Sequence, residues 1–161
     1  MNEPLKQPVS LADYLGAMSQ AGFQAGISWK VVEAKWPGIE KAFKGFKPAT
    51  VARFTGEDID RLMQNPEVIR NRAKLEGIVL NARRIIELEK IHGLFKKYLD
   101  SLGSFENQLK GLHKEFKFLG ESGGYYFLWR VGETVPDWDE WEKRQAAGAR
   151  KNYRTSKPKS W

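Results

Sequence analysis

The segment from Asn71 to about Ile91 places the strongest constraint on the fold, because its apolar residues keep helical spacing with Gly77 as the only weak point. These apolar residues recur every three or four positions and are Leu75, Ile78, Val79, Ala82, Ile85, Ile86 and Leu88. The pattern predicts an amphipathic helix that buries one face. We expect it to be the central and longest helix of the protein.

Shorter stripes with the same spacing precede this segment. The first predicts a helix from Leu11 to about Gln20, with Ser10 as its N-cap and Gly22 as its stop. A second helical face begins near residue 27, and we expect Pro37 to interrupt it. The chain is therefore predicted to begin with short helices.

Helical patterns also cover the middle and later parts of the chain. Thr55 precedes two acids and an apolar stripe, which predicts a capped helix that ends at Asn65. Two further stripes predict helices over residues 95–102 and 105–116. The aromatic-rich segment Gly123–Val131 fits either a strand or a buried helix, and we favour the helix because the rest of the chain is helical. The predicted fold class is all-α.

The composition is that of one globular domain, with 161 residues of which 41% are hydrophobic. The chain has no apolar run long enough to span a membrane, and its first residues lack the layout of a signal peptide. It has no cysteine and two histidines, which argues against a disulfide, a thiolate nucleophile or a metal centre. We expect a cytoplasmic monomer that does not bind a membrane and needs no cofactor or metal.

The net charge of +7 is concentrated at the C-terminus. The last nineteen residues contain seven lysines and arginines and no acid, so the remainder is balanced at 20 basic and 20 acidic residues. We therefore divide the chain into one helical domain, residues 1–148, and a basic tail, residues 149–161. Such a tail is either a solvated extension or an arm that follows an anionic polymer.

A helix, a tight hairpin and a second helix are predicted around the segment Asn65–Lys74. We expect Asn71 to adopt a left-handed backbone in the turn, which would leave free backbone N–H groups at the start of the next helix. Such a helix start binds phosphate, and nearby cations add attraction for a nucleic-acid backbone. The candidate DNA-binding residues are Ile69, Arg70, Asn71, Arg72 and Lys74. The alternative is an ordinary corner between two helices with solvated charges.

The segment Gly22–Trp29 combines small residues with two large aromatic side chains. An aromatic wall with nearby amide or hydroxyl groups can stack a nucleobase and read its edge. The candidate pocket residues from this segment are Phe23, Gln24, Ser28 and Trp29. The alternative is a close helix crossing in which Trp29 belongs to the core.

These two segments belong to a longer set of motifs. They are QAGISW at 24–29, FKPATVARF at 46–54, EDIDRLMQNPEVIRNRAKLEGIVLNAR at 57–83 and FKFLG at 116–120. Together they resemble the 3-methyladenine DNA glycosylase I family of helix-hairpin-helix repair enzymes. The resemblance covers about two thirds of the chain, and the pairing of QAG-x-SW with IRN-R-x-K at this separation is highly specific.

The resemblance implies a helix-hairpin-helix DNA glycosylase-like helical bundle that binds double-stranded DNA through the hairpin. It implies that a damaged adenine is flipped into a pocket beside Trp29, with Phe23 and Tyr125 as further walls, and that its N-glycosidic bond is hydrolysed. A 3-methylated adenine is cationic and leaves readily, so the site mainly has to extrude, recognise and shield it. The family lacks the catalytic aspartate of its superfamily, and none is visible in this chain. No catalytic residue is assigned.

The chain departs from the family pattern at several positions. The pocket glutamate of the family aligns with Ala21, which we keep as a pocket position although its methyl group accepts no hydrogen bond. The N-terminal YHDxEWG-like signature has no counterpart before Gly22. The zinc ligands of the family are missing, with Asp137 near the late histidine position. We expect packed aromatic residues, Trp138 and Trp141, to fill the corresponding space.

Three hypotheses for the function follow. The first is an alkylpurine glycosylase that tolerates the loss of the glutamate because the leaving base is cationic. The second is a catalytically silent DNA-binding or damage-sensing module, which Ala21 and the missing signature favour. The third is a structural protein that kept only the scaffold, and the basic residues of the hairpin argue against it.

Overall fold

The computed structural model describes residues 3–151, and every regular element in that range is helical. The elements are α1 (Leu11–Gln24), α2 (Trp29–Ala42), the 3-10 turn η1 (Lys44–Phe46), α3 (Pro48–Val51), α4 (Gly56–Met63), α5 (Arg72–His92), α6 (Phe95–Leu102), α7 (Phe105–Glu115), α8 (Glu121–Arg130) and α9 (Trp138–Lys151). The all-α prediction is confirmed. None of the helices in the described range combines the length and the apolar character needed to cross a bilayer.

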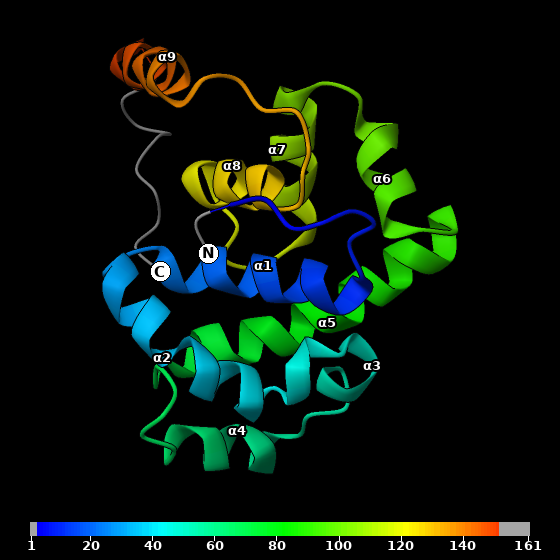
Figure 1. The fold of residues 1–161 in the computed structure, drawn as a ribbon, viewed down its shortest axis with the longest axis vertical. Helices are drawn as coiled ribbons and strands as arrows, with labels where there is room; N and C mark the ends of the chain where they lie inside the picture. The colour runs from blue at the N-terminus through cyan, green and yellow to red at the C-terminus, as the bar shows by residue number, and fades with distance from the viewer. Residues whose placement is uncertain (1–2, 152–161) are drawn as a thin grey trace.

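Two hydrophobic cores share the helices α1 and α5, which lie side by side in the middle of the molecule (Figure 1). One core packs Tyr14 and Ile85 against α6, α7 and α8. The other packs Phe23 and Leu75 against α2, η1, α3 and α4. Along α1 the residues of the two cores alternate, because this helix is buried on two faces. Helix α5 instead gives its first half, from Leu75 to Ala82, to the second core and Ile85 and Leu88 to the first. The predicted central helix is confirmed as α5.

Most predicted helix starts are confirmed by their caps. The Ser10 hydroxyl accepts the Asp13 N–H at 3.0 Å at the start of α1. At the start of α4 the Thr55 hydroxyl accepts the Asp58 N–H, while the Asp58 carboxylate accepts the Thr55 N–H. This reciprocal capping box satisfies two backbone donors. The segment from residue 123 onwards is helical in α8, as favoured over a strand.

Two predicted helix ends are wrong. Helix α1 continues past Gly22 to Gln24, and Phe23, buried in the second core, packs its last turn against the rest of the protein. Helix α2 runs through Pro37 to Ala42. Val32 and Ile39, two turns apart on one face and on either side of Pro37, are both fully buried. Their burial holds the helix together across the hydrogen bond that proline cannot make.

The ends of the described chain lie on the α6–α9 side. The Leu5 N–H donates to the Arg130 carbonyl at 2.7 Å, so the N-terminal segment crosses the end of α8 (Figure 1). Helix α9 passes the predicted domain boundary at Gly148 and ends at Lys151. Most of the predicted basic tail, residues 152–161, lies outside the described residues, so the division into domain and tail stays a prediction.

Candidate nucleic-acid interface

The hairpin between α4 and α5 consists of residues 64–71. Asn71 has an extended backbone with φ −117°, so the predicted left-handed conformation is wrong. Its side chain is instead the N-cap of α5, where Oδ1 accepts the Lys74 N–H at 3.1 Å. Asparagine is as good at capping as at turning, and here the cap decides its conformation.

Four backbone N–H groups at the end of this hairpin and the start of α5 are available to an anion. Those of Ile69 and Arg70 in the hairpin and of Arg72 and Ala73 in α5 have no acceptor among the described residues. The first N–H groups of a helix lack partners within the helix, and the helix dipole makes its start attractive to anions. The start of α5 therefore has the donors that bind an anion such as a DNA phosphate.

The three cations predicted to surround this site differ in their surroundings. Arg70 is exposed and makes no ion pair with a described residue. Arg72 is paired with Asp60 and, at 3.4 Å, with Glu76, which raises the pKa of its guanidinium. These acids cancel much of its charge. Arg70 is thus the hairpin cation most available to an anionic ligand.

Lys74 is buried, with 2% of its surface exposed. Its ammonium donates to the Ala25 carbonyl at 2.6 Å and to the Phe23 carbonyl at 3.4 Å, at the end of α1. Burial lowers the pKa of Lys74 to about 8. The side chain therefore fastens the start of α5 to the turn that precedes Trp29, rather than extending into solvent.

Trp29 opens α2 and is half-buried. Its indole packs edge-to-face on the Tyr126 ring with centroids 6.1 Å apart, and Tyr126 packs on Trp129 at 5.9 Å. The Tyr126 hydroxyl donates to Gln20 Oε1 at 3.5 Å. The structure thus forms a half-buried aromatic cluster of Trp29, Tyr126 and Trp129 beside the end of α1. We call it the Trp29 cluster.

Sequence reasoning selected Tyr125 and missed Tyr126. The Tyr125 ring packs against Phe105, Trp138 and Trp141, and its hydroxyl donates to the Pro136 carbonyl at 2.6 Å. Consecutive residues of a helix point about 100° apart, so neighbouring tyrosines of α8 face different partners. The aromatic residues expected in the place of the family zinc are packed together here. No group of three or more potential ligands gathers into a metal site within residues 3–151.

The remaining pocket candidates are mostly packed. Ala21 and Phe23 each expose 1% of their surface. Ala21 lies where α1 crosses α8, and a Cβ built on Gly123 would be 3.8 Å from its methyl group. Gln24 is half-buried and its Nε2 has no hydrogen-bond partner, whereas Ser28 is exposed at the start of α2. The turn thus exposes Ser28 next to Trp29 but holds Ala21 in a helix crossing.

A cavity lies on the other side of this turn, between α1, α5 and the segment before α8. It has room for a water centre in about 10 Å³ and is lined by Met18, Ser19, Gly22, Phe23, Lys74, Ile78, Asn81, Lys117 and Phe118. That is enough for one water molecule and far too small for a purine. The exposed side of the turn carries the Trp29 cluster instead.

The helical fold that carries this hairpin and aromatic turn is similar to the folds of solved DNA glycosylases. The crystal structure of 3-methyladenine DNA glycosylase I superposes with a TM-score of 0.70 and 26% identity, over 81% of each chain. The Staphylococcus aureus structure that describes 3-methyladenine recognition gives 0.68 and 32% identity, over 81% of this chain and 79% of that one. Its described fold is therefore that of these enzymes.

The chain belongs to the methyladenine glycosylase family, whose model matches residues 13–122. DNA-3-methyladenine glycosylase from Haemophilus influenzae is 35% identical, with 69% of this chain and 71% of the relative covered. DNA-3-methyladenine glycosylase 1 from Escherichia coli is 37% identical, with 53% of this chain and 44% of the relative covered. The helix-hairpin-helix resemblance seen in the sequence is confirmed.

Proposed function

We propose that the protein binds double-stranded DNA through the α4–α5 hairpin and hydrolyses the N-glycosidic bond of an alkylated purine such as 3-methyladenine. The observation that carries the proposal is the contact of Lys74 with the carbonyls of Phe23 and Ala25. It holds the start of α5 against the turn that precedes Trp29. A duplex held at the hairpin would then present a flipped base to the Trp29 cluster.

Hydrolysis of this N-glycosidic bond needs little chemical activation from the protein. A 3-methylated adenine carries a positive charge that weakens its bond to the sugar, so stacking, shielding and orientation supply most of what the reaction needs. The Trp29 indole provides a stacking face worth about 1–3 kcal/mol for an extruded base. Water is the nucleophile, and the proposal needs no strong acid.

The test is release of 3-methyladenine from methylated DNA, measured by chromatography of the free base. We expect slow release by the wild type and none by Trp29→Ala, while both bind duplex DNA. Trp138→Ala is the matched control, because Trp138 is a half-exposed tryptophan that packs on Tyr125 instead. Equal release by Trp29→Ala would refute stacking at this site.

A second candidate, a DNA-binding module without catalysis, is favoured by the burial of Ala21, which exposes 1% of its surface. Its methyl group offers no acceptor for the edge of a base. If the wild type binds duplex DNA with preference for methylated sites but releases no base at any protein excess, this module replaces the enzyme.

A further inference from the structure

Glu33 is a carboxylate one helical turn after Trp29. Residues four apart in a helix lie on the same face with Cβ atoms about 5–6 Å apart, so Glu33 and Trp29 are neighbours on the surface of α2. Glu33 is exposed and makes no ion pair with any residue in the described range. Its charge is available for a ligand.

The Trp29 cluster lies within the field of this charge. Burial is the main cause that raises the pKa of Tyr126; Arg130 and a hydrogen bond with Gln24 lower it, and the Glu33 carboxylate raises it slightly. Tyr126 is the ring in contact with Trp29. Glu33 is the smallest of these four influences on the pKa of Tyr126, and its place one turn along α2 is what brings its carboxylate beside Trp29.

A cationic base stacked on Trp29 needs a negative partner, because a positive charge that loses water without one is costly to hold. Ala21 supplies none, because its methyl group accepts no hydrogen bond and only 1% of its surface is exposed. We propose that Glu33 is the specificity-determining carboxylate of this chain, recognising the positive charge and the amino group of an alkylated purine stacked on Trp29. This inference rests on the proposed function, and it assigns the negative partner to α2 instead of α1.

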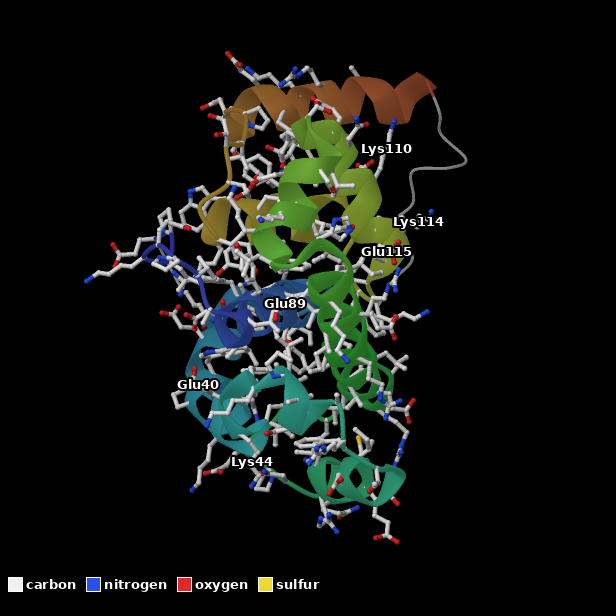
Figure 2. The ribbon with its side chains drawn as sticks, turned by 90° about the vertical axis from the view of Figure 1, so that its right-hand side faces the viewer. Glu40, Lys44, Glu89, Lys110, Lys114 and Glu115 are labelled. Carbon is white, nitrogen blue, oxygen red and sulfur yellow. The ribbon has the colours of Figure 1, made fainter. Side chains whose placement is uncertain are left out.

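Two small probes separate charge recognition from stacking. The 3,9-dimethyladeninium ion is a permanently cationic purine, and 9-methyladenine is its neutral counterpart. Binding of each is followed by the indole N–H signal of Trp29 in NMR spectra, assigned with Trp29→Phe. Glu33→Gln removes the charge with little change of shape, and Glu40→Gln does the same near the other end of α2, close to Lys44 (Figure 2).

We expect the wild type and Glu40→Gln to bind the cation more tightly than the neutral purine. Glu33→Gln should bind the cation about ten-fold or more weakly, since a hydrogen bond to a charged group contributes about 1.5–3 kcal/mol. Its affinity for 9-methyladenine should not change. The inference is overturned if Glu33→Gln binds the cation like the wild type, or if the wild type does not prefer the cation.

Base release from methylated DNA distinguishes this inference from the proposed function. Release by the wild type at a rate that Glu33→Gln leaves unchanged overturns the role of Glu33 and leaves the proposed hydrolysis standing. Binding of the cation that depends on Glu33, without release of any base, supports the role of Glu33 and overturns the hydrolysis.

Discussion

Replacement of Lys74 by methionine tests whether its ammonium is desolvated where α5 meets the end of α1. Methionine keeps the length of the side chain and removes its charge. In the folded protein burial lowers the pKa of Lys74 to about 8, against 10.5 for the ordinary side chain. Between these values the unfolded chain binds more protons than the folded one, so the free energy of unfolding increases with pH.

The size of this increase follows from the two pKa values. A difference of 2.5 pH units at 1.36 kcal/mol each corresponds to about 3 kcal/mol in total, most of which is gained between pH 8 and 10. Above pH 10 the buried Tyr14 and Tyr98 act in the opposite direction. Burial raises the pKa of each to about 12, so the folded state then holds more protons than the unfolded chain and stability falls with pH.

The assay is urea unfolding followed by tryptophan fluorescence at pH 7, 8, 9 and 10. We expect the wild type to gain about 2–3 kcal/mol relative to Lys74→Met between pH 7 and 10. Lys110→Met is the control, because Lys110 is exposed on α7 (Figure 2) and its replacement should leave the pH dependence of the wild type intact. Parallel curves for the wild type and Lys74→Met would refute the argument that burial controls this ammonium.

Three further predictions concern DNA binding and packing. Arg70→Ala should weaken duplex binding and reduce the steepness of the plot of log affinity against log salt concentration by about one. Arg72→Ala should change the affinity and this slope less, because Asp60 and Glu76 already neutralise Arg72. Binding titrations at several salt concentrations measure the affinity and the slope. Ala21→Glu should lower the free energy of unfolding by several kcal/mol, since it places an unpaired carboxylate against Gly123, and a variant with unchanged melting temperature would contradict that packing. Deletion of the residues after Gly148 should leave the melting temperature nearly unchanged and weaken non-specific DNA binding, and a large drop in the melting temperature would show that the tail is part of the fold.

The helices were predictable from the sequence because each buries a periodic apolar face and most begin with a capping side chain. Ser10 and Thr55 are examples in which a local hydrogen bond is visible in the sequence itself. The prediction that Pro37 ends its helix was wrong, because whether a proline breaks a helix depends on how strongly the residues around it are buried. Val32 and Ile39 are buried in the core formed with η1, α3 and α4, and that packing outweighs the local cost of the proline.

The candidate site was predictable in its segments but less so in its side chains. The hairpin and the turn before Trp29 were selected from their residue types, and their pocket and DNA-binding roles stay predictions. Lys74 reads as a surface cation in the sequence, and only its long-range contacts with Phe23 and Ala25 reveal a buried one. Whether Tyr125 or Tyr126 contacts Trp29 depends on the rotation of α8 about its axis, and the sequence of a short aromatic segment does not predict that rotation.

Because α1 and α5 each belong to both hydrophobic cores, the halves of the molecule cannot separate without breaking two shared helices. A clamshell closure around a ligand is therefore costly for this protein. If it acts on DNA as proposed, the protein is the rigid member of the complex, and the duplex has to supply the deformation. Sequences and lesions that make DNA easy to bend or unstack would then be bound preferentially, even at positions the protein never touches.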